Sequence, residues 1–332
     1  MSINVTTIGG WSGSFNVLYG IKSNVSFNIS AIISVADSGG KTWEIRDKYG
    51  ILPPWDMRRA IAALANNTEM VRKLFEYSFS QEEWVIGSNK IGNILLTALV
   101  DITGSFEKAV STLSDMFDVR WRVIPVTLEN VELAVKFEDG TIVIGEKNID
   151  VSETNPWERT HNVDQNITAA WLEWSPGTLN PRAREAILNA DFVIIGPWDL
   201  YTSIIPNLLS VGMREALDMT RAKIIYICNI MTKRGETTNM EVRDFIDTID
   251  QYITPWKLDY VIVNNGSIDP EIVAKYKQEE NKKPLLIRDY AIFRNAPYTI
   301  VERDIVNGDD YVRHDPRKLA SILEDIIQGW IK

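Results

Sequence analysis

The N-terminal residues decide the fold: residues 3–8, INVTTI, are followed by residues 9–13, GGWSG. The first stretch is typical of a buried strand, and the second is a glycine-rich turn. Residues 15–21 then have the apolar spacing of a helix, and residues 29–35 form a second apolar strand. A strand, a glycine-rich turn, a helix and a second strand, in this order, open a doubly wound sheet.

The rest of the chain extends this pattern. A mostly helical region comes first, and short apolar strands of the kind found in buried parallel sheets follow it. We expect helices at residues 57–64, 70–77, 91–102, 106–117, 204–217 (broken near Gly212) and 316–330, strands at residues 122–125, 131–137, 141–144, 192–195, 223–228 and 260–263, and a loop at residues 146–166. We predict an α/β fold, a Rossmann-like parallel sheet with helices on both faces. Residues 1–332 would form one domain, with a helical and β-hairpin elaboration at residues 57–150.

Composition excludes several classes of protein. A net charge of -10 argues against nucleic acid as a partner, because an acidic protein repels phosphate backbones. A small anionic ligand stays compatible if backbone N–H groups or local Arg and Lys offset the charge. No apolar run approaches the ~18 residues that span a bilayer, and no secretory signal is present, so we expect a cytoplasmic protein. The single cysteine, Cys228, excludes internal disulfides. A homo-oligomer is left open.

Ligands of open α/β sheets bind at the carboxyl ends of the strands, so the expected strand exits are the candidate sites. At the first exit, Gly9, Gly10, Ser12 and Gly13 would let backbone N–H groups approach a phosphate, although a structural turn accounts for them equally well. At the second exit, Asp37 can accept hydrogen bonds from ribose hydroxyls, with a solvated turn residue as the alternative.

Two further exits are rich in hydroxyl and amide side chains. Thr202 and Ser203 can hold a phosphate or cap the helix that follows, and capping is the simpler role. Asn229, Thr232 and Asn264 offer donors and acceptors to a base or a sugar, but Asn is also common in turns.

Charged and titratable residues complete the candidate set. Arg313, just ahead of the last helix, can bind a phosphate through two hydrogen bonds. Asp37 and Asp56 together suit Mg²⁺ beside ligand phosphates, although the sequence does not place them together. The two histidines, His161 and His314, indicate no nucleophilic triad, and no Cys/His metal motif is present.

Together these segments resemble the gluconeogenesis-factor family, whose relatives include 2-phospho-L-lactate transferase. The matches follow one another over nearly the whole chain, and they are specific together although each alone is not. They are residues 36–40 (ADSGG), 45–54 (IRDKYGILPP), 92–96 (GNILL, with Asn93), 123–128 (VIPVTL), 200–209 (LYTSIIPNLL), 228–232 (CNIMT), 263–266 (VNNG) and 312–316 (VRHDP).

The resemblance implies a Rossmann-like fold and a UDP-sugar ligand, typically UDP-N-acetylglucosamine. It also implies a role that links carbon metabolism to cell-wall synthesis and cell shape. The transferase relatives instead join a lactyl phosphate to a deazaflavin, and they carry a Ser-Pro-Asp segment where this chain has residues 53–56, PPWD. That difference favours a binding protein, with a transferase as the alternative. The predicted ligand-binding residues are the exit residues above with Asp56, Asn93 and Arg313.

The chain departs from the family pattern chiefly at tryptophans. Trp stands where the family has Gly at Trp11, Trp43, Trp55, Trp84, Trp121 and Trp198, and Ser88 replaces a usual His. Independent drift from Gly, the smallest residue, to Trp, the largest, is improbable at six sites. A lineage that lost ligand binding would not select Trp repeatedly either. We favour the interpretation that these positions are UGA codons, which the source organism reads as glycine and which are translated as tryptophan in this sequence. These positions are then expected in or near turns, where a positive φ favours glycine.

Overall fold

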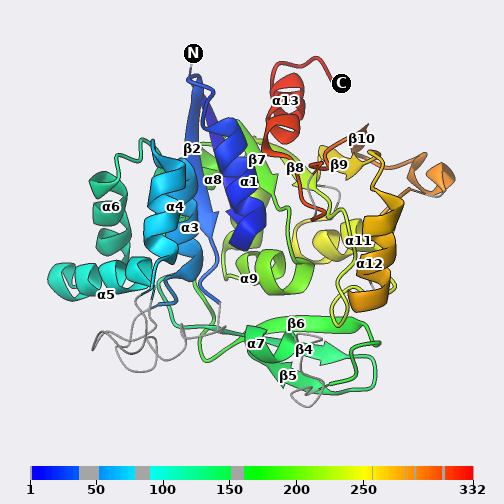
Figure 1. Cartoon of the computed structure of the whole chain (residues 1–332), viewed down its shortest axis with the longest axis horizontal. Coiled ribbons are helices and arrows are strands. Elements are labelled where there is room, and N and C mark those ends of the chain that lie inside the picture. The colour runs from blue at the N-terminus through cyan, green and yellow to red at the C-terminus, as the bar shows by residue number, and fades with distance from the viewer. Residues whose placement is uncertain are drawn as a thin grey trace.

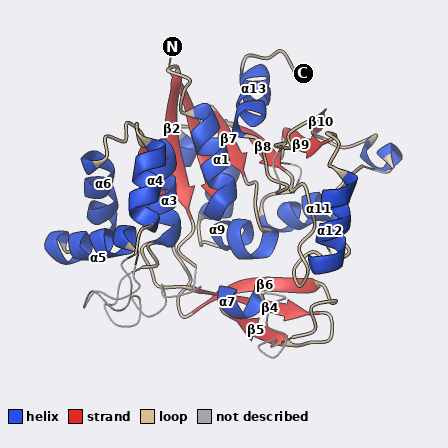
Figure 2. Cartoon of the chain, in the orientation of Figure 1, coloured by secondary structure: helices blue, strands red, loops and turns tan. Residues whose placement is uncertain are grey.

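The computed structural model describes residues 2–36, 52–78, 90–150, 161–255, 257–280, 282–287, 289–308 and 311–331 (Figure 1). Within them a large parallel sheet is surrounded by helices, and a small antiparallel sheet lies below it (Figure 2). The predicted α/β, Rossmann-like class is confirmed. None of the described helices is long and apolar enough to cross a membrane.

Seven strands of the described chain form the main sheet, in the order β10-β9-β8-β7-β1-β2-β3. Every neighbouring pair is parallel. The chain runs from β1 outward to β3 and then returns to β7 on the other side of β1, so the direction of winding changes there. A crevice opens at such a switch point, at the carboxyl ends of the strands. The strands are β1 (Ile3–Gly9), β2 (Phe27–Ile33), β3 (Arg122–Pro125), β7 (Phe192–Ile195), β8 (Lys223–Ile227), β9 (Tyr260–Asn264) and β10 (Thr299–Arg303).

Helices cover the sheet, so its central strands are apolar on both sides. All of β8 is buried except its first residue, as expected for a strand covered on both faces. Helix α1 contacts both α3 and α13, and all three lie toward the viewer in Figure 1. The helices are α1 (Trp11–Ile21), α3 (Trp55–Leu64), α4 (Thr68–Glu76), α5 (Ile91–Thr103), α6 (Phe106–Met116), α8 (Pro181–Leu188), α9 (Ile205–Leu208), α10 (Met213–Met219), α11 (Val242–Tyr252), α12 (Pro270–Glu280) and α13 (Pro316–Ile327).

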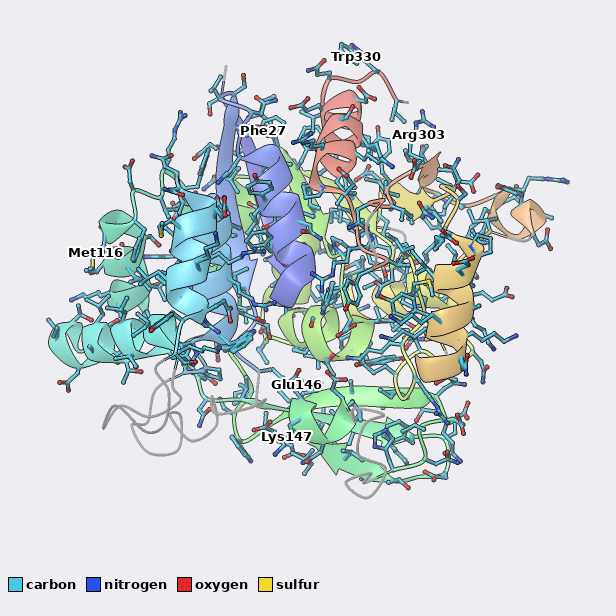
Figure 3. All side chains as sticks on the ribbon, in the orientation of Figure 1. Phe27, Met116, Glu146, Lys147, Arg303 and Trp330 are labelled. Atoms are coloured by element: carbon cyan, nitrogen blue, oxygen red, sulfur yellow. The ribbon has the colours of Figure 1, made fainter. Side chains whose placement is uncertain are left out.

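The small sheet has the order β5-β4-β6 and is antiparallel. Its strands are β4 (Glu132–Phe137), β5 (Ile142–Ile144) and β6 (Ile167–Glu173). The expected hairpin turn is present, and Gly140 has a φ of +87° there. Helix α7 (Glu146–Ile149), with Glu146 and Lys147 labelled in Figure 3, packs against β4 and β5. The predicted elaboration at residues 57–150 includes β3, which belongs to the main sheet, and omits β6, which belongs to the small sheet. The domain boundaries stay a prediction.

Two expectations about local structure were wrong. Helix α1 begins at Trp11 and not after the glycine-rich segment, because the extended Gly10 is the last residue before the helix. A Cβ on Gly13 would lie 1.9 Å from the carbonyl oxygen of Pro197, so this glycine permits close packing of α1 against the β7 exit. The expected loop at residues 146–166 includes α7, whose single turn is too short for a periodic pattern.

Candidate functional site

The exits of β7 and β8 form a cavity of about 200 Å³ at the carboxyl edge of the main sheet. The chain leaves β7 through Gly196 and the cis-bonded Pro197, then enters a short π-helix at Leu200–Ile204. Residues 229–233 after β8 supply a second wall, and residues 311–314 ahead of α13 supply a third. Of the predicted residues, this cavity brings together Asn229, Thr232 and Arg313.

Asn229 and Arg313 are the groups in this cavity best suited to a ligand. Asn229 is nine-tenths buried, and its Oδ1 has no hydrogen-bond partner among the described residues. A buried amide oxygen without a partner is costly, and a ligand donor would relieve that cost. The Arg313 guanidinium lies 5.8 Å from the centre of the Tyr311 ring, and no carboxylate of the described chain pairs with it.

His314 fixes this wall to the sheet. Its Nε2 donates to the carbonyl oxygen of Cys228 at 3.2 Å, which assigns the proton to that nitrogen. Burial lowers the pKa of His314 to about 4, so the ring is neutral at physiological pH. Cys228 is fully buried, and burial raises the pKa of its thiol to about 12, so the thiolate form is disfavoured.

A largely buried lysine joins the exits to the small sheet. The Lys233 ammonium lies 2.7 Å from Asp199, 2.8 Å from Glu236 and 2.9 Å from Asp150. Burial alone would lower the pKa of Lys233, but the three carboxylates outweigh burial and hold it well above its usual value. Glu236 is fully buried and accepts a hydrogen bond from Thr202 at 3.0 Å, and burial raises its pKa above the usual range.

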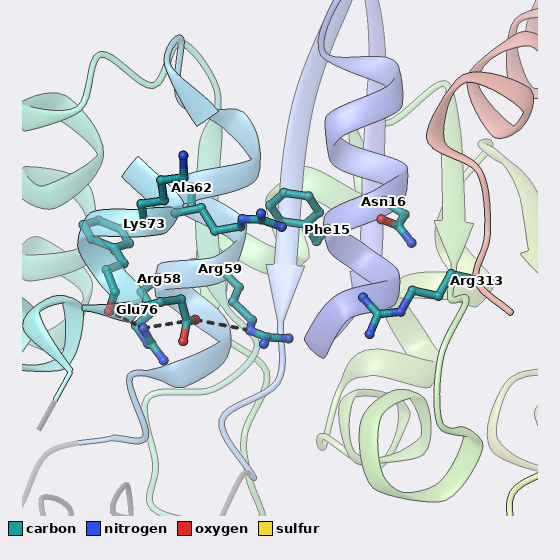
Figure 4. A pocket seen from close by; sticks show the side chains of 10 residues that line it. Phe15, Asn16, Arg58, Arg59, Ala62, Lys73, Glu76 and Arg313 are labelled. Atoms are coloured by element: carbon teal, nitrogen blue, oxygen red, sulfur yellow. Dashed lines mark hydrogen bonds and ion pairs between the residues drawn. The ribbon is translucent and has the colours of Figure 1, made fainter. Parts of the chain in front are cut away.

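A second, larger cavity of about 350 Å³ lies between α1 and the α3–α4 pair, and Arg313 also lines it (Figure 4). Its other cations are residues that the sequence analysis did not predict for the site. Arg58 and Arg59 belong to α3, and Arg72 and Lys73 belong to α4. The one signal that could have found them is the two pairs of adjacent cations in a chain of net charge -10.

The glycine-rich segment lies against the β7 exit and α3. A Cβ on Gly10 would lie 2.7 Å from Asp56 Oδ2 and 3.6 Å from the carbonyl oxygen of Ser203, so these three predicted residues are neighbours. A Cβ on Gly9 would meet the Ser14 hydroxyl at 2.5 Å. The side chain of Ser12 is not described, and Asp37 lies outside the described residues.

The remaining predicted residues lie outside both cavities. Asn264 accepts hydrogen bonds from the backbone N–H groups of Gly266 and Ile305 and donates to the Gly266 carbonyl oxygen, so its amide secures the β9 exit. Asn93 is buried in α5, beside Gly92, which faces Phe75. Ligand roles for the residues predicted from sequence stay predictions.

The described residues hold no group of three His, Cys, Asp or Glu side chains suited to a metal ion. Asp56 is buried beside Gly10, and its predicted partner Asp37 is not described. Mg²⁺ held with ligand phosphates therefore stays a prediction.

The tryptophan positions differ from one another in backbone geometry. Among the described members of the six, only Trp198 has a positive φ, of 150°, and its side chain lines the smaller cavity. Trp11 and Trp55 begin helices, and Trp121 donates to the Phe27 carbonyl oxygen at 3.2 Å. The expectation of glycine-like conformations thus has geometric support at Trp198 alone. Trp174, outside the six, also has a positive φ, of 71°. Trp43 and Trp84 lie outside the described residues, as does Ser88.

Known proteins resemble the chain over nearly its whole length. The family model described as 2-phospho-L-lactate transferase CofD matches residues 5–306. The gluconeogenesis factor of Bacillus subtilis is 33% identical over 324 residues, 98% of each chain. A relative from Aquifex aeolicus, provisionally named a gluconeogenesis factor, is 38% identical over 330 residues, 98% of this chain and 97% of its own. A crystal structure of a Bacillus halodurans protein aligns with a TM-score of 0.88 at 31% identity, covering 98% of this chain and all of the other.

Replacing Trp198 by Gly should destabilise the fold less than the same change at another half-buried Trp, because it also relieves the roughly 1 kcal/mol that a positive φ costs a residue with a Cβ. Trp171→Gly is the matched control: that half-buried Trp lies in β6 and donates to Glu173, and its loss should destabilise by several kcal/mol. Urea unfolding measures both effects. A loss of stability for Trp198→Gly as large as that for Trp171→Gly would show that the backbone at residue 198 does not favour glycine.

His314 should make stability depend on pH between its folded and unfolded pKa values. The folded pKa, about 4, lies below the ordinary 6.5, so the folded state binds fewer protons in that window. Its contribution, at most about 3 kcal/mol, is present above pH 6.5 and is lost as the pH falls toward 4. Unfolding of wild type and His314→Gln across this range should show a flatter profile for the variant. Parallel profiles would mean that His314 is not the group responsible.

Proposed function

The chain belongs to the 2-phospho-L-lactate transferase CofD family, and from that premise we propose that it binds a nucleotide sugar, typified by UDP-N-acetylglucosamine, at the exits of β7 and β8. In this proposal it is a regulator without turnover that links carbon metabolism to cell-wall synthesis and cell shape. The observation that carries the proposal is a cavity lined by both Asn229 and Arg313. Within the described part of the chain, the Asn229 oxygen has no hydrogen-bond partner and the Arg313 guanidinium pairs with no carboxylate.

The chemistry of the cavity suits such a ligand. Aromatic rings of Tyr276 and Tyr311 offer faces on which a base can stack, and Arg313 and Lys282 offer positive charge to a diphosphate. The Asn229 oxygen would accept from an N–H of the base or a sugar hydroxyl. These groups provide recognition, and the described wall supplies no general base beside a nucleophile.

The family model's own name supports a second candidate, transfer of a phospholactyl group to a deazaflavin. A thermal-shift screen distinguishes the two, because a ligand that binds the folded state raises Tm. UDP-sugars should raise Tm if the chain is a nucleotide-sugar regulator. A rise with the deazaflavin and the phospholactyl substrate alone, together with product formation, would favour the transferase.

Arg313→Ala should weaken UDP-N-acetylglucosamine binding by about 1.5–3 kcal/mol, the usual scale for a hydrogen bond to a charged group. Arg214→Ala is the matched control, since Arg214 is exposed on α10 and lines neither cavity. Calorimetric titration of each variant, in the native background and with Trp198→Gly, gives the affinities. Equal affinities for Arg313→Ala and Arg214→Ala would remove Arg313 from the site, and no binding in either background would end the proposal.

A further inference from the structure

The larger cavity concentrates positive charge in an acidic protein. Among the described residues, five cations line it, Arg58, Arg59, Arg72, Lys73 and Arg313, against one carboxylate, that of Glu76. The whole chain has a net charge of -10, so this concentration is opposite in sign to the average surface. A concave surface lined by one sign of charge attracts ligands of the other sign.

Some of these cations form ion pairs within the described part of the chain. Glu76 lies 3.3 Å from Arg58 and 3.9 Å from Arg59. Lys73 pairs with Glu69 at 2.6 Å, but both side chains are mostly exposed, and such a pair is weak. The side chains of Arg72 and Arg313 have no hydrogen bond or ion pair within the described part of the chain.

The cavity is built on rigid groups. Arg58 is completely buried, and its Nη1 donates to the Phe75 carbonyl oxygen at 2.6 Å, which fixes a guanidinium at the cavity wall. Phe75 is held in turn by an edge-to-face contact with Phe117, with ring centres 4.9 Å apart. Figure 4 shows Arg59 and Arg313 reaching toward one another from opposite sides of the cavity, with Phe15 above them.

We propose that this cavity is a second ligand site, separate from the nucleotide cavity, for a small phosphorylated metabolite. The volume of about 350 Å³ fits a small ligand. A guanidinium group can donate two parallel hydrogen bonds to a phosphate. The Phe15 and Phe75 rings suit a ligand that has a carbon body as well as a phosphate. Because Arg313 lines both cavities, occupancy of one changes the charge that the other presents.

The test uses 3-phosphoglycerate as the probe, with inorganic phosphate in parallel, in calorimetric titrations of the full chain without nucleotide. 3-Phosphoglycerate should bind, and more tightly than inorganic phosphate. Arg72→Ala and Arg59→Ala should each weaken it about tenfold, the size of one charge-assisted hydrogen bond. Lys108→Ala, an exposed cation on α6 outside both cavities, should leave binding unchanged.

The outcomes separate this site from the proposed nucleotide site. Arg72→Ala should leave UDP-N-acetylglucosamine affinity unchanged, and 3-phosphoglycerate binding should persist even if no nucleotide sugar binds. No binding of the probe, or equal losses in Arg72→Ala and Lys108→Ala, would overturn the proposal. Loss of nucleotide affinity in Arg72→Ala would also overturn it, because the two cavities would then form one site.

Discussion

The buried ammonium of Lys233 is the constraint on which the strand-exit edge depends. An ammonium taken out of water costs several kcal/mol unless carboxylates surround it closely. Here they come from three places: Asp199 after β7, Glu236 after β8, and Asp150 beyond α7. One cation therefore ties both strand exits to the small sheet. Burial is the main cause that raises the pKa of Glu236, and the neighbouring carboxylates of Asp199 and Asp150 raise it further against the lowering effect of Lys233.

Because these ion pairs hold the strand exits in place, the side chains that line the two cavities project from fixed backbone segments. His314 joins the segment before α13 to the β8 exit through the Cys228 carbonyl oxygen, and this contact positions the neighbouring Arg313. Arg313 then faces both cavities, one lined by amides and aromatic rings and the other by arginines. In this acidic protein the cations of the larger cavity are gathered where helices α1, α3 and α4 meet the segment before α13, and this local positive charge is what the proposed anion site requires.

The sequence predicted the fold class well, and some of its candidate site residues line one cavity. Strands such as residues 122–125 and 192–195 match β3 and β7, because a continuous apolar run followed by turn residues is typical of a buried parallel strand. The Asn229 and Arg313 predictions fall in one cavity because exits of parallel strands share an edge. Arg58 and Arg72 were not predicted, because their meeting depends on the packing of α3 against α4. The packing role of Gly13 could not be predicted either, because Pro197, which it contacts, is distant in the sequence.

Hydrogen–deuterium exchange with and without UDP-N-acetylglucosamine tests the central claim most directly, because it locates a ligand without altering the protein. The account predicts slower exchange in residues 198–204, 229–233 and 311–314, the three segments around the smaller cavity, with little change in β10 or the C-terminal part of α13. Protection confined to other segments at saturating ligand, or none despite measured binding, would contradict the assignment of the nucleotide site to the exits of β7 and β8.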